Sequence, residues 1–408
     1  MSDRALEALS TVQIADVYKS GQLAATLRRA SGQTEFCYLP KYLEGGGPPI
    51  ATSLACTKKT LVTPAGAVPP FFAGLLPEGR RLSSLRRAVK TSADDELSLL
   101  LAVGRDAIGD VQIVPEGTRP TPAEPLIQVS KHWSEVRFAE VLASAGVVDP
   151  VALPGVQDKA SARMISVPVA RSGERYLLKI DPPEYPLVVA NEAFFLSRAR
   201  NARIDCVRAT VVQDVDGRPG LLVRRFDRIP LATGQAAALP CEDACQVLGR
   251  WPADKYNFTA EEVVMGLARH CAAQTLALRN FFQQICFAWL TGNGDVHAKN
   301  LSILGTGTGE WRASPAYDLP STVPYGDTSL ALALQGRTRG ISRRHLLGFA
   351  AEIGLPERVG TRVLDELLVR LTDLKDTLRS AVAFPAKTTA DLIKELRYRR
   401  RQALPAGM

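Results

Sequence analysis

The spacing of apolar residues changes near residue 240, and this change limits the possible folds more than any other feature of the chain. Before it, short apolar runs are separated by turns that contain glycine, a pattern that predicts strands. After it, apolar residues recur every three or four positions, which predicts helices at 260–290, 342–353, 357–380 and 389–401. We therefore expect an α+β protein whose C-terminal lobe is all-α.

Turn signals and prolines divide the part of the chain ahead of that change. Hairpins are expected around residues 19–22, 171–174 and 216–217, where a glycine lies between two apolar runs. Helical patterns cover 71–89, 97–104 and 191–200, and Ser92 with Asp95 is expected to cap the second of them. Residues 115–125 hold four prolines and cannot form an element. The sequence thus predicts a β-rich module at 1–125, a mixed α/β lobe at 126–235 and a helical lobe at 236–408.

Composition excludes several classes of protein. With 46% apolar and 23% charged residues, the 408-residue chain can bury several cores. It has no apolar run of the roughly 20 residues that a membrane span needs, and MSDRALEALS has no signal pattern, so we expect a cytoplasmic protein without membrane contact. The seven cysteines form no CxxC pair, although Cys241 and Cys245 could share a helix face, so we expect buried free thiols and no zinc site.

Charge gives a weaker signal. A net charge of +8 leaves room for a polyanionic partner but is too small for a chain of this size to indicate nucleic-acid binding by itself. The local run RYRRR at 397–401 closes the C-terminal helix predicted from about Thr389. It is either a solvated helix end, where cations complement the helix dipole, or a patch that contacts DNA.

The stretch NGDVHAKN at 293–300 carries the first candidate catalytic residues. It follows a strongly apolar helix that Gly292 is expected to end, so its polar groups have a firm support. Asp295 lies five positions before Asn300, the same separation as the catalytic acid and the metal-binding amide of protein kinases. In phosphoryl transfer such an acid accepts the proton of the attacking hydroxyl, and the amide coordinates Mg²⁺. A helix cap at Asp295 and an Asx turn at Asn300 are the structural alternatives.

Two further positions fit the same chemistry. Asp318 lies in a proline-interrupted loop behind a predicted hairpin, where it could be the main metal ligand, or simply a loop acid. Lys179 lies in an apolar strand, where its charge is costly unless a partner such as Glu192 in the next helix neutralises it; a strand-edge lysine that reaches solvent is the alternative. The loop 153–162 precedes this strand and could contact phosphates, but its single glycine matches no phosphate-loop motif.

These motifs together resemble the HipA family of bacterial serine/threonine kinases. The similar segments, in chain order, are FFAGLLPEG at 71–79, GRDAIGDVQIV at 104–114, PGVQDK at 154–159, YLLKI at 176–180, NE at 191–192, RRFDR at 224–228, CEDACQVLG at 241–249 with KY at 255–256, GDVHAKN at 294–300 and PAYDLPS at 315–321. The resemblance spans nearly the whole chain. It implies a bilobal protein-kinase-like fold in which 126–235 is the nucleotide lobe and 236–408 carries the catalytic and metal loops.

The resemblance also implies a function for individual residues. Asp295 would be the catalytic base, and Asn300 and Asp318 would bind Mg²⁺. The residues expected to contact ATP are Pro154, Gly155, Val156, Gln157, Asp158, Lys159, Lys179, Glu192, Arg224, Arg225, Phe226, His297, Lys299 and Tyr317. The family's substrate class is an aminoacyl-tRNA synthetase, whose phosphorylation stops translation and growth and produces drug tolerance. Its partner is a HipB-type helix-turn-helix antitoxin, through which the kinase mainly reaches operator DNA.

One position departs from the family pattern. The family has an autophosphorylated serine just before the phosphate loop, where this chain has Ala152, so either that regulation is absent or Ser161 or Ser166 replaces it.

Two other functions compete with the kinase. A non-catalytic DNA-binding co-repressor would use 342–359, which loosely matches a helix-turn-helix, although its leucines also fit a bundle core. A small-molecule kinase of the aminoglycoside or choline type would share the Asp295 loop but would leave the N-terminal module without a use.

Overall fold

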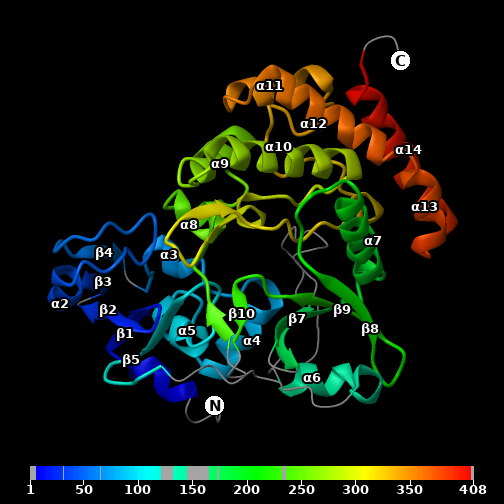
Figure 1. The fold of residues 1–408 in the computed structure, drawn as a ribbon. Helices are drawn as coiled ribbons and strands as arrows, with labels where there is room; N and C mark the ends of the chain where they lie inside the picture. Colours follow the sequence, from blue (N-terminus) through cyan, green and yellow to red (C-terminus); the bar gives the residue numbers. More distant parts are fainter. Residues whose placement is uncertain are drawn as a thin grey trace.

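A computed structural model describes residues 6–30, 32–64, 66–120, 132–144, 165–171, 174–231 and 236–405. Three parts are visible in Figure 1: a blue-to-cyan N-terminal module, a middle lobe built on a small sheet, and a mostly helical C-terminal lobe above both. Each has its own buried apolar cluster, and the largest one fills the C-terminal lobe and extends to the sheet and helix of the middle lobe. The mixed architecture predicted from the sequence is confirmed, and the C-terminal lobe, predicted to be all-α, is mainly helical but includes one small sheet.

The N-terminal module consists of an antiparallel five-stranded sheet and several short helices. Its strands are β1 (Ile14–Lys19), β2 (Gln22–Ala30), β3 (Gln33–Tyr38), β4 (Leu61–Pro64) and β5 (Val111–Pro115), in the order β4-β3-β2-β1-β5. The helices are α2 (Pro40–Glu44), α3 (Pro70–Ala73), α4 (Gly79–Val89) and α5 (Glu96–Val103). Lys19 pairs with Gln22 across the turn, as predicted. Residues 71–89 form two helices rather than one, because Pro77 lies in the loop between α3 and α4.

The cap of the second helical pattern differs from the prediction. Asp95 is the N-cap of α5, and its side chain accepts a hydrogen bond from the Ser98 backbone N–H. Ser92 lies outside the helix in a turn, so its assignment as part of the cap was wrong. Only the residue directly before the first helical residue can accept hydrogen bonds from the free N–H groups of the first turn, and that residue is Asp95.

The middle lobe contains a four-stranded antiparallel sheet, β6-β7-β9-β8. Its strands are β6 (Ile165–Arg171), β7 (Glu174–Ile180), β8 (Ala209–Gln213) and β9 (Pro219–Arg224). Helix α6 (Phe138–Ser144) packs on one side of the sheet, and α7 (Val188–Asn201) connects β7 to β8. Both predicted hairpins and the predicted helix are confirmed, with β6 paired to β7 and β8 to β9. Two short strands, β10 (Arg228–Pro230) and β11 (Ala236–Ala238), lead to the C-terminal lobe.

The C-terminal lobe is mostly helical and includes one small sheet. Its helices are α8 (Ala244–Val247), α9 (Ala260–Ala268), α10 (Gln274–Thr291), α11 (Arg343–Glu352), α12 (Glu357–Arg370), α13 (Leu374–Ala381) and α14 (Ala386–Ala403). The sheet consists of β12 (Cys241–Asp243), β13 (Ser302–Gly305) and β14 (Trp311–Ala313), and β13 with β14 is the hairpin expected before Asp318. The predicted leucine stripe of α12 and α13 is buried, at Leu364, Leu367, Leu368, Leu371, Leu374 and Leu378.

Several helix boundaries in this lobe were wrong. The pattern at 260–290 is two helices, the pattern at 357–380 breaks after Arg370, and the last helix begins at Ala386 rather than near Thr389. Cys241 lies in β12 and Cys245 in α8, so they do not share a helix face. Periodicity predicts which residues are buried, but it cannot show where the chain changes direction between two helices that contribute to the same core.

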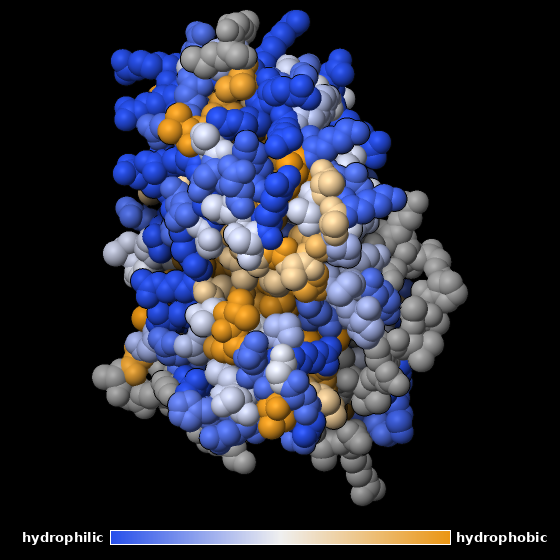
Figure 2. Space-filling model, turned by 90° about the vertical axis from the view of Figure 1, so that its right-hand side faces the viewer, coloured by the Kyte–Doolittle hydropathy of each residue, from blue (hydrophilic) through white to orange (hydrophobic). Residues whose placement is uncertain are grey.

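Two segments of the helical lobe for which the sequence left alternatives can now be compared with the structure. In the helix-turn-helix-like segment, Leu346, Phe349 and Ile353 are buried in the main core, which supports the bundle-core interpretation. Arg399 of the basic run is fully buried, so this residue is neither a solvated cation nor a DNA contact. Arg397 and Arg401 are exposed, and the upper part of the face in Figure 2 is mainly hydrophilic. Among the described helices, none combines the length and the apolar content that a membrane span requires.

Candidate active site

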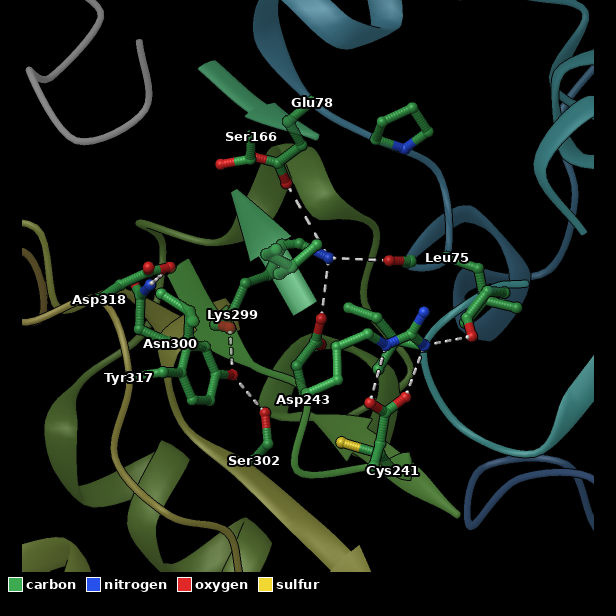
Figure 3. Close-up of a pocket in the computed structure, with 18 of the residues that line it drawn as sticks. Leu75, Glu78, Ser166, Cys241, Asp243, Lys299, Asn300, Ser302, Tyr317 and Asp318 are labelled. Carbon is green, nitrogen blue, oxygen red and sulfur yellow. Dashed lines mark hydrogen bonds and ion pairs between the residues drawn. The ribbon is translucent and has the colours of Figure 1, made fainter. Parts of the chain in front are cut away.

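The three parts of the chain meet around a cavity of about 370 Å³. The middle lobe contributes side chains of β6, β7 and residues 223–227. The C-terminal lobe contributes Cys241, Asp243, Gln246, Lys255, Asp295, His297, Lys299, Asn300, Ser302, Tyr317 and Asp318. The N-terminal module lines it with residues 74–78, 81, 103 and 106–108. Figure 3 shows Asn300 and Asp318 together on one side, with Glu78 and Leu75 of the N-terminal module across from them.

The position of the Asp295 loop is set by α10. Phe281, Phe282, Ile285, Cys286 and Trp289 of this helix are buried, as the sequence predicted. Gly292 ends the helix with φ 72°, in the left-handed region, and an added Cβ would lie 2.7 Å from Val323 Cγ2. The buried Arg399 donates a hydrogen bond of 2.9 Å from Nη1 to the Trp289 carbonyl, which ties the same helix end to α14.

Asp295 is buried but lines the cavity, with 5% of its surface exposed. Its backbone N–H donates to Asn293 Oδ1 at 3.0 Å. Its carboxylate accepts a hydrogen bond of 3.1 Å from the hydroxyl of Tyr256, whose ring also packs edge-on against His297. The carboxylate is therefore held in one orientation toward the cavity, as a general base must be.

Lys179 lies at the centre of a buried charge cluster. Its ammonium donates to both carboxylate oxygens of Glu192, at 2.7 and 3.0 Å, and also to Asp318. Burial lowers the pKa of Lys179, but Asp318 and Glu192 outweigh burial and raise it above the ordinary value. The lysine therefore stays charged inside the protein, and the strand-edge alternative is excluded by its burial.

Asn300 and Asp318 are in direct contact on the same side of the cavity. Asn300 Nδ2 donates to Asp318 Oδ2 at 3.2 Å, and Asn300 Oδ1 accepts from the His297 backbone N–H. Asp318 adopts φ 53°, and its side chain is 35% exposed, so one carboxylate edge faces the cavity. A carboxylate that faces the cavity is the ligand type that Mg²⁺ prefers, whereas the side-chain oxygen of Asn300 is engaged by the His297 N–H and its nitrogen faces Asp318. Asp318 and Asn300 are two side chains only, and the described residues contain no cluster of three or more His, Cys, Asp or Glu that could hold a metal ion.

Aromatic and apolar side chains form the other end of the cavity. Phe226 and Tyr317 lie with ring centroids 5.7 Å apart, next to Leu177 and Val223. The Tyr317 hydroxyl donates to the Lys299 carbonyl at 2.7 Å, and Arg224 pairs with Glu174 at 2.8 Å. We call residues 224–228, which join the two kinase-like lobes here, the hinge. This end has the flat apolar walls that a purine base needs.

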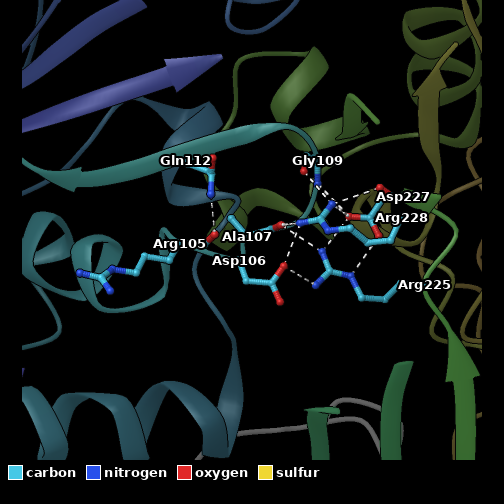
Figure 4. A network of polar contacts seen from close by, with 8 residues as sticks. All are labelled: Arg105, Asp106, Ala107, Gly109, Gln112, Arg225, Asp227 and Arg228. Carbon is cyan, nitrogen blue, oxygen red and sulfur yellow. Dashed lines mark hydrogen bonds and ion pairs between the residues drawn. The ribbon is translucent and has the colours of Figure 1, made fainter. Parts of the chain in front are cut away.

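Arg225 of the hinge does not direct its charge into the cavity. Its guanidinium binds both Asp227, at 2.8 Å, and Asp106 of the N-terminal module, at 2.9 Å (Figure 4). Arg228 contacts the same two acids, and the Gly109 backbone N–H donates to Asp227 at 3.0 Å. We call these residues, Asp106, Gly109, Arg225, Asp227 and Arg228, the hinge clamp. It fastens the N-terminal module to the hinge.

Lys299 makes a second connection to the N-terminal module. Its ammonium binds Asp243 at 2.8 Å and the Gly74 carbonyl at 3.0 Å, with Glu78 at 3.9 Å. Burial lowers the pKa of Lys299, but Asp243 and Glu78 outweigh it and raise the pKa. Lys299 lines the cavity, yet its charge is already satisfied by the protein.

The structure thus brings most of the predicted residues together. Those that line the cavity are Lys179, Arg224, Arg225, Phe226, Asp295, His297, Lys299, Asn300, Tyr317 and Asp318, while Glu192 lies behind Lys179. Pro154, Gly155, Val156, Gln157, Asp158 and Lys159 lie outside the described residues, as do Ala152 and Ser161. Ser166 lies on β6 opposite Lys179 and lines the cavity, not in a loop before it.

Sequence reasoning missed the contribution of the N-terminal module. Leu75, Glu78, Arg81 and Asp106 all line the cavity, and Tyr256 contacts the carboxylate of Asp295. The segments that hold them were noticed only as motifs of a separate module. The charged pair Glu78 and Arg81, directly after an apolar stretch, was the one available signal.

Comparison with known proteins agrees with this geometry. Residues 15–114 match the HipA N-terminal domain, and residues 151–374 match the HipA-like C-terminal domain. A Sinorhizobium fredii protein named "Putative kinase Y4dM" is 30% identical over 94% of this chain and 96% of its own length. The serine/threonine-protein kinase toxin HipA of Shewanella oneidensis is 27% identical over 77% of this chain and 76% of its own.

A solved structure extends the agreement to the fold. HipA from Shewanella oneidensis, in a complex with HipB and operator DNA, superposes with a TM-score of 0.75 over 95% of this chain and 97% of its own, at 19% identity. The domain matches, the relatives and the shared architecture lead to one conclusion: the chain belongs to the HipA family.

Proposed function

We propose that this chain is an ATP- and Mg²⁺-dependent serine/threonine protein kinase that acts as the toxin of a HipBA-type pair. The observation that carries the proposal is the convergence of Lys179, Asp318 and Asn300 on one side of a cavity that Asp295 also lines. Lys179, Asp318 and Asn300 come from three different segments of the chain. If the contact between them were only structural, apolar residues would stabilise the fold as well or better. Kinase relatives with similar sequences support the same chemistry.

The residues present fit both the nucleotide and the metal. Phe226 and Tyr317 would hold the base, and Lys179 would bind a phosphate oxygen in addition to Glu192. Asp318 and Asn300 would hold Mg²⁺, which supplies charge neutralisation on the phosphates when bound. Asp295 would accept the proton of the substrate hydroxyl, and Tyr256 would keep its carboxylate oriented for that transfer.

The partner and the substrate form the finer part of the proposal. A HipB-type helix-turn-helix antitoxin is supported by the HipA structure that shares this fold, which contains HipB and operator DNA. An aminoacyl-tRNA synthetase as substrate follows from the family resemblance alone, and it would place the chain in the cytoplasm. Phosphoproteomics that compares cells expressing the active chain with cells expressing an inactive variant would identify the substrate.

The test of the catalytic assignment is Asp295→Asn, which keeps the shape of the side chain and removes its basicity. Transfer of labelled phosphate from ATP to a protein substrate should fall by roughly 10²- to 10⁴-fold, the contribution typical of a general base. ATP affinity should stay unchanged, since the proposed nucleotide contacts remain. Asp391→Asn on the exposed surface of α14 makes the same charge change and should transfer phosphate normally. Equal transfer by the Asp295 variant and wild type would refute the assignment.

A further inference from the structure

The wall of the cavity that the N-terminal module supplies contains one cation with an unusual environment. Arg81 lies on α4 and lines the cavity, and α4 contacts strand β6 of the middle lobe. The other lysines and arginines that line the cavity in the described part of the chain all bind acids. These pairs are Lys179 with Glu192, Arg224 with Glu174, Arg225 with Asp227, Lys255 with Glu78, and Lys299 with Asp243.

Arg81 alone has no such partner there. Within the described residues its guanidinium forms neither an ion pair nor a hydrogen bond. Asp106, the acid whose charge acts on Arg81, is already engaged by Arg225 at 2.9 Å and by Arg228 at 3.0 Å. Burial and the neighbouring charge of Arg225 both lower the pKa of Arg81. Its five N–H donors therefore line a half-buried cavity wall with no acceptor from the described part of the chain, which leaves them available to a ligand.

The neighbours of Arg81 indicate which part of a ligand it would meet. The charges of Asp106 and Arg225 act on Arg81, and both belong to the hinge clamp, so Arg81 lies toward the hinge end of the cavity. Lys179, Asn300 and Asp318 form a separate cluster, and Lys179 is the cation placed for phosphate. An arginine at the hinge end is placed for uncharged acceptors, which in a nucleotide are the ring nitrogens and the ribose hydroxyls.

We propose that Arg81 donates hydrogen bonds to the nucleoside part of the bound nucleotide, which makes the N-terminal module a component of the nucleotide site. This inference rests on the proposed kinase function and adds a binding residue from outside the two kinase-like lobes. It also gives the hinge clamp a purpose, because the clamp fixes residues 106–109 of the N-terminal module against the hinge. A nucleotide would then be held by all three parts of the chain.

Isothermal titration of the full-length protein with Mg·ADP and with adenosine tests the proposal. Arg81→Ala should weaken the binding of both ligands by the same factor, about tenfold, because adenosine contains the contacted part and has no phosphate. Arg81→Lys should bind with intermediate affinity, since lysine keeps the charge but loses the planar donor fork. Arg87→Ala is the matched control: Arg87 is exposed on the same helix and does not line the cavity, so it should bind both ligands like wild type.

The other outcomes are distinguishable. Unchanged binding of both ligands by Arg81→Ala overturns the proposal. Weaker ADP binding with unchanged adenosine binding overturns it in favour of a phosphate contact, and normal binding of both with slower protein phosphorylation overturns it in favour of a substrate contact. A wild-type protein that binds neither ligand would instead refute the proposed kinase function itself.

Discussion

The hinge clamp predicts the effect of Asp227→Asn in detail. Asp227 is buried and accepts hydrogen bonds from Arg225 at 2.8 and 3.0 Å, from Arg228 at 2.7 Å and from the Gly109 N–H at 3.0 Å. Burial alone would raise the pKa of Asp227, but Arg225 and Arg228 lower it from 3.8 to about 2. This difference corresponds to about 2 kcal/mol of stability that is present above pH 3.8 and is lost as the pH falls through about 2.

The substitution should cost at least that amount. Asparagine removes the charge and turns one acceptor into a donor that faces other donors, so a loss of about 2 to 4 kcal/mol is expected at neutral pH. Hydrogen exchange of the backbone amides of residues 106–112 is the suitable assay, since the clamp joins this segment to the hinge. Their protection should fall by roughly 30-fold or more, with core amides of α10 much less affected. Unchanged protection at 106–112 would refute the reasoning that the clamp holds the module in place.

Three further predictions concern the cavity and its surroundings. Lys179→Met should weaken ATP binding, which titration with ATP measures, and unchanged ATP affinity would contradict the phosphate role. It should also lower the thermal stability, because Glu192 loses its ion pair in the interior. Tyr256→Phe should lower kcat about tenfold with an unchanged KM for ATP, since only the orientation of Asp295 is lost; a changed KM alone would contradict this. Burial raises the pKa of Glu242 from 4.5 to about 7. Between these two pH values the carboxyl is protonated in the folded chain and ionised in the unfolded chain, so the free energy of unfolding should fall as the pH rises from 4.5 to about 7. Denaturation curves measured at a series of pH values should show a smaller loss of unfolding free energy over this pH range for Glu242→Gln than for wild type. An equal pH dependence in the two proteins would rule the effect out.

The features that sequence analysis predicted are those with a local cause. The Asp295 loop was recognisable because an acid and an amide at fixed spacing follow a helix whose apolar residues are buried. Lys179 was recognisable because a charge in an apolar strand requires a partner, and Glu192 is that partner. Hairpins were predictable because the glycine turn and the two strands are adjacent in the chain.

The features that were missed depend on contacts between distant segments. Asp106 and Arg225 are 119 positions apart, and nothing in either segment alone indicates that they meet. Arg399 appeared to be one of several surface cations, yet its guanidinium lies 4.1 Å from the Trp289 ring and donates to two carbonyls. Glu395, four residues earlier on the same helix, pairs with its Nε, but the two carbonyl acceptors and the ring come from distant segments, which no local pattern can indicate.

The most direct test of the kinase site is a crystal structure with a non-hydrolysable ATP analogue and Mn²⁺, whose anomalous signal locates the metal. The account predicts a manganese ion bound by Asp318 and Asn300, with the phosphates beside Lys179 and the base between the hinge and Tyr317. A metal or a nucleotide bound away from these residues, with the cavity left empty, would contradict it.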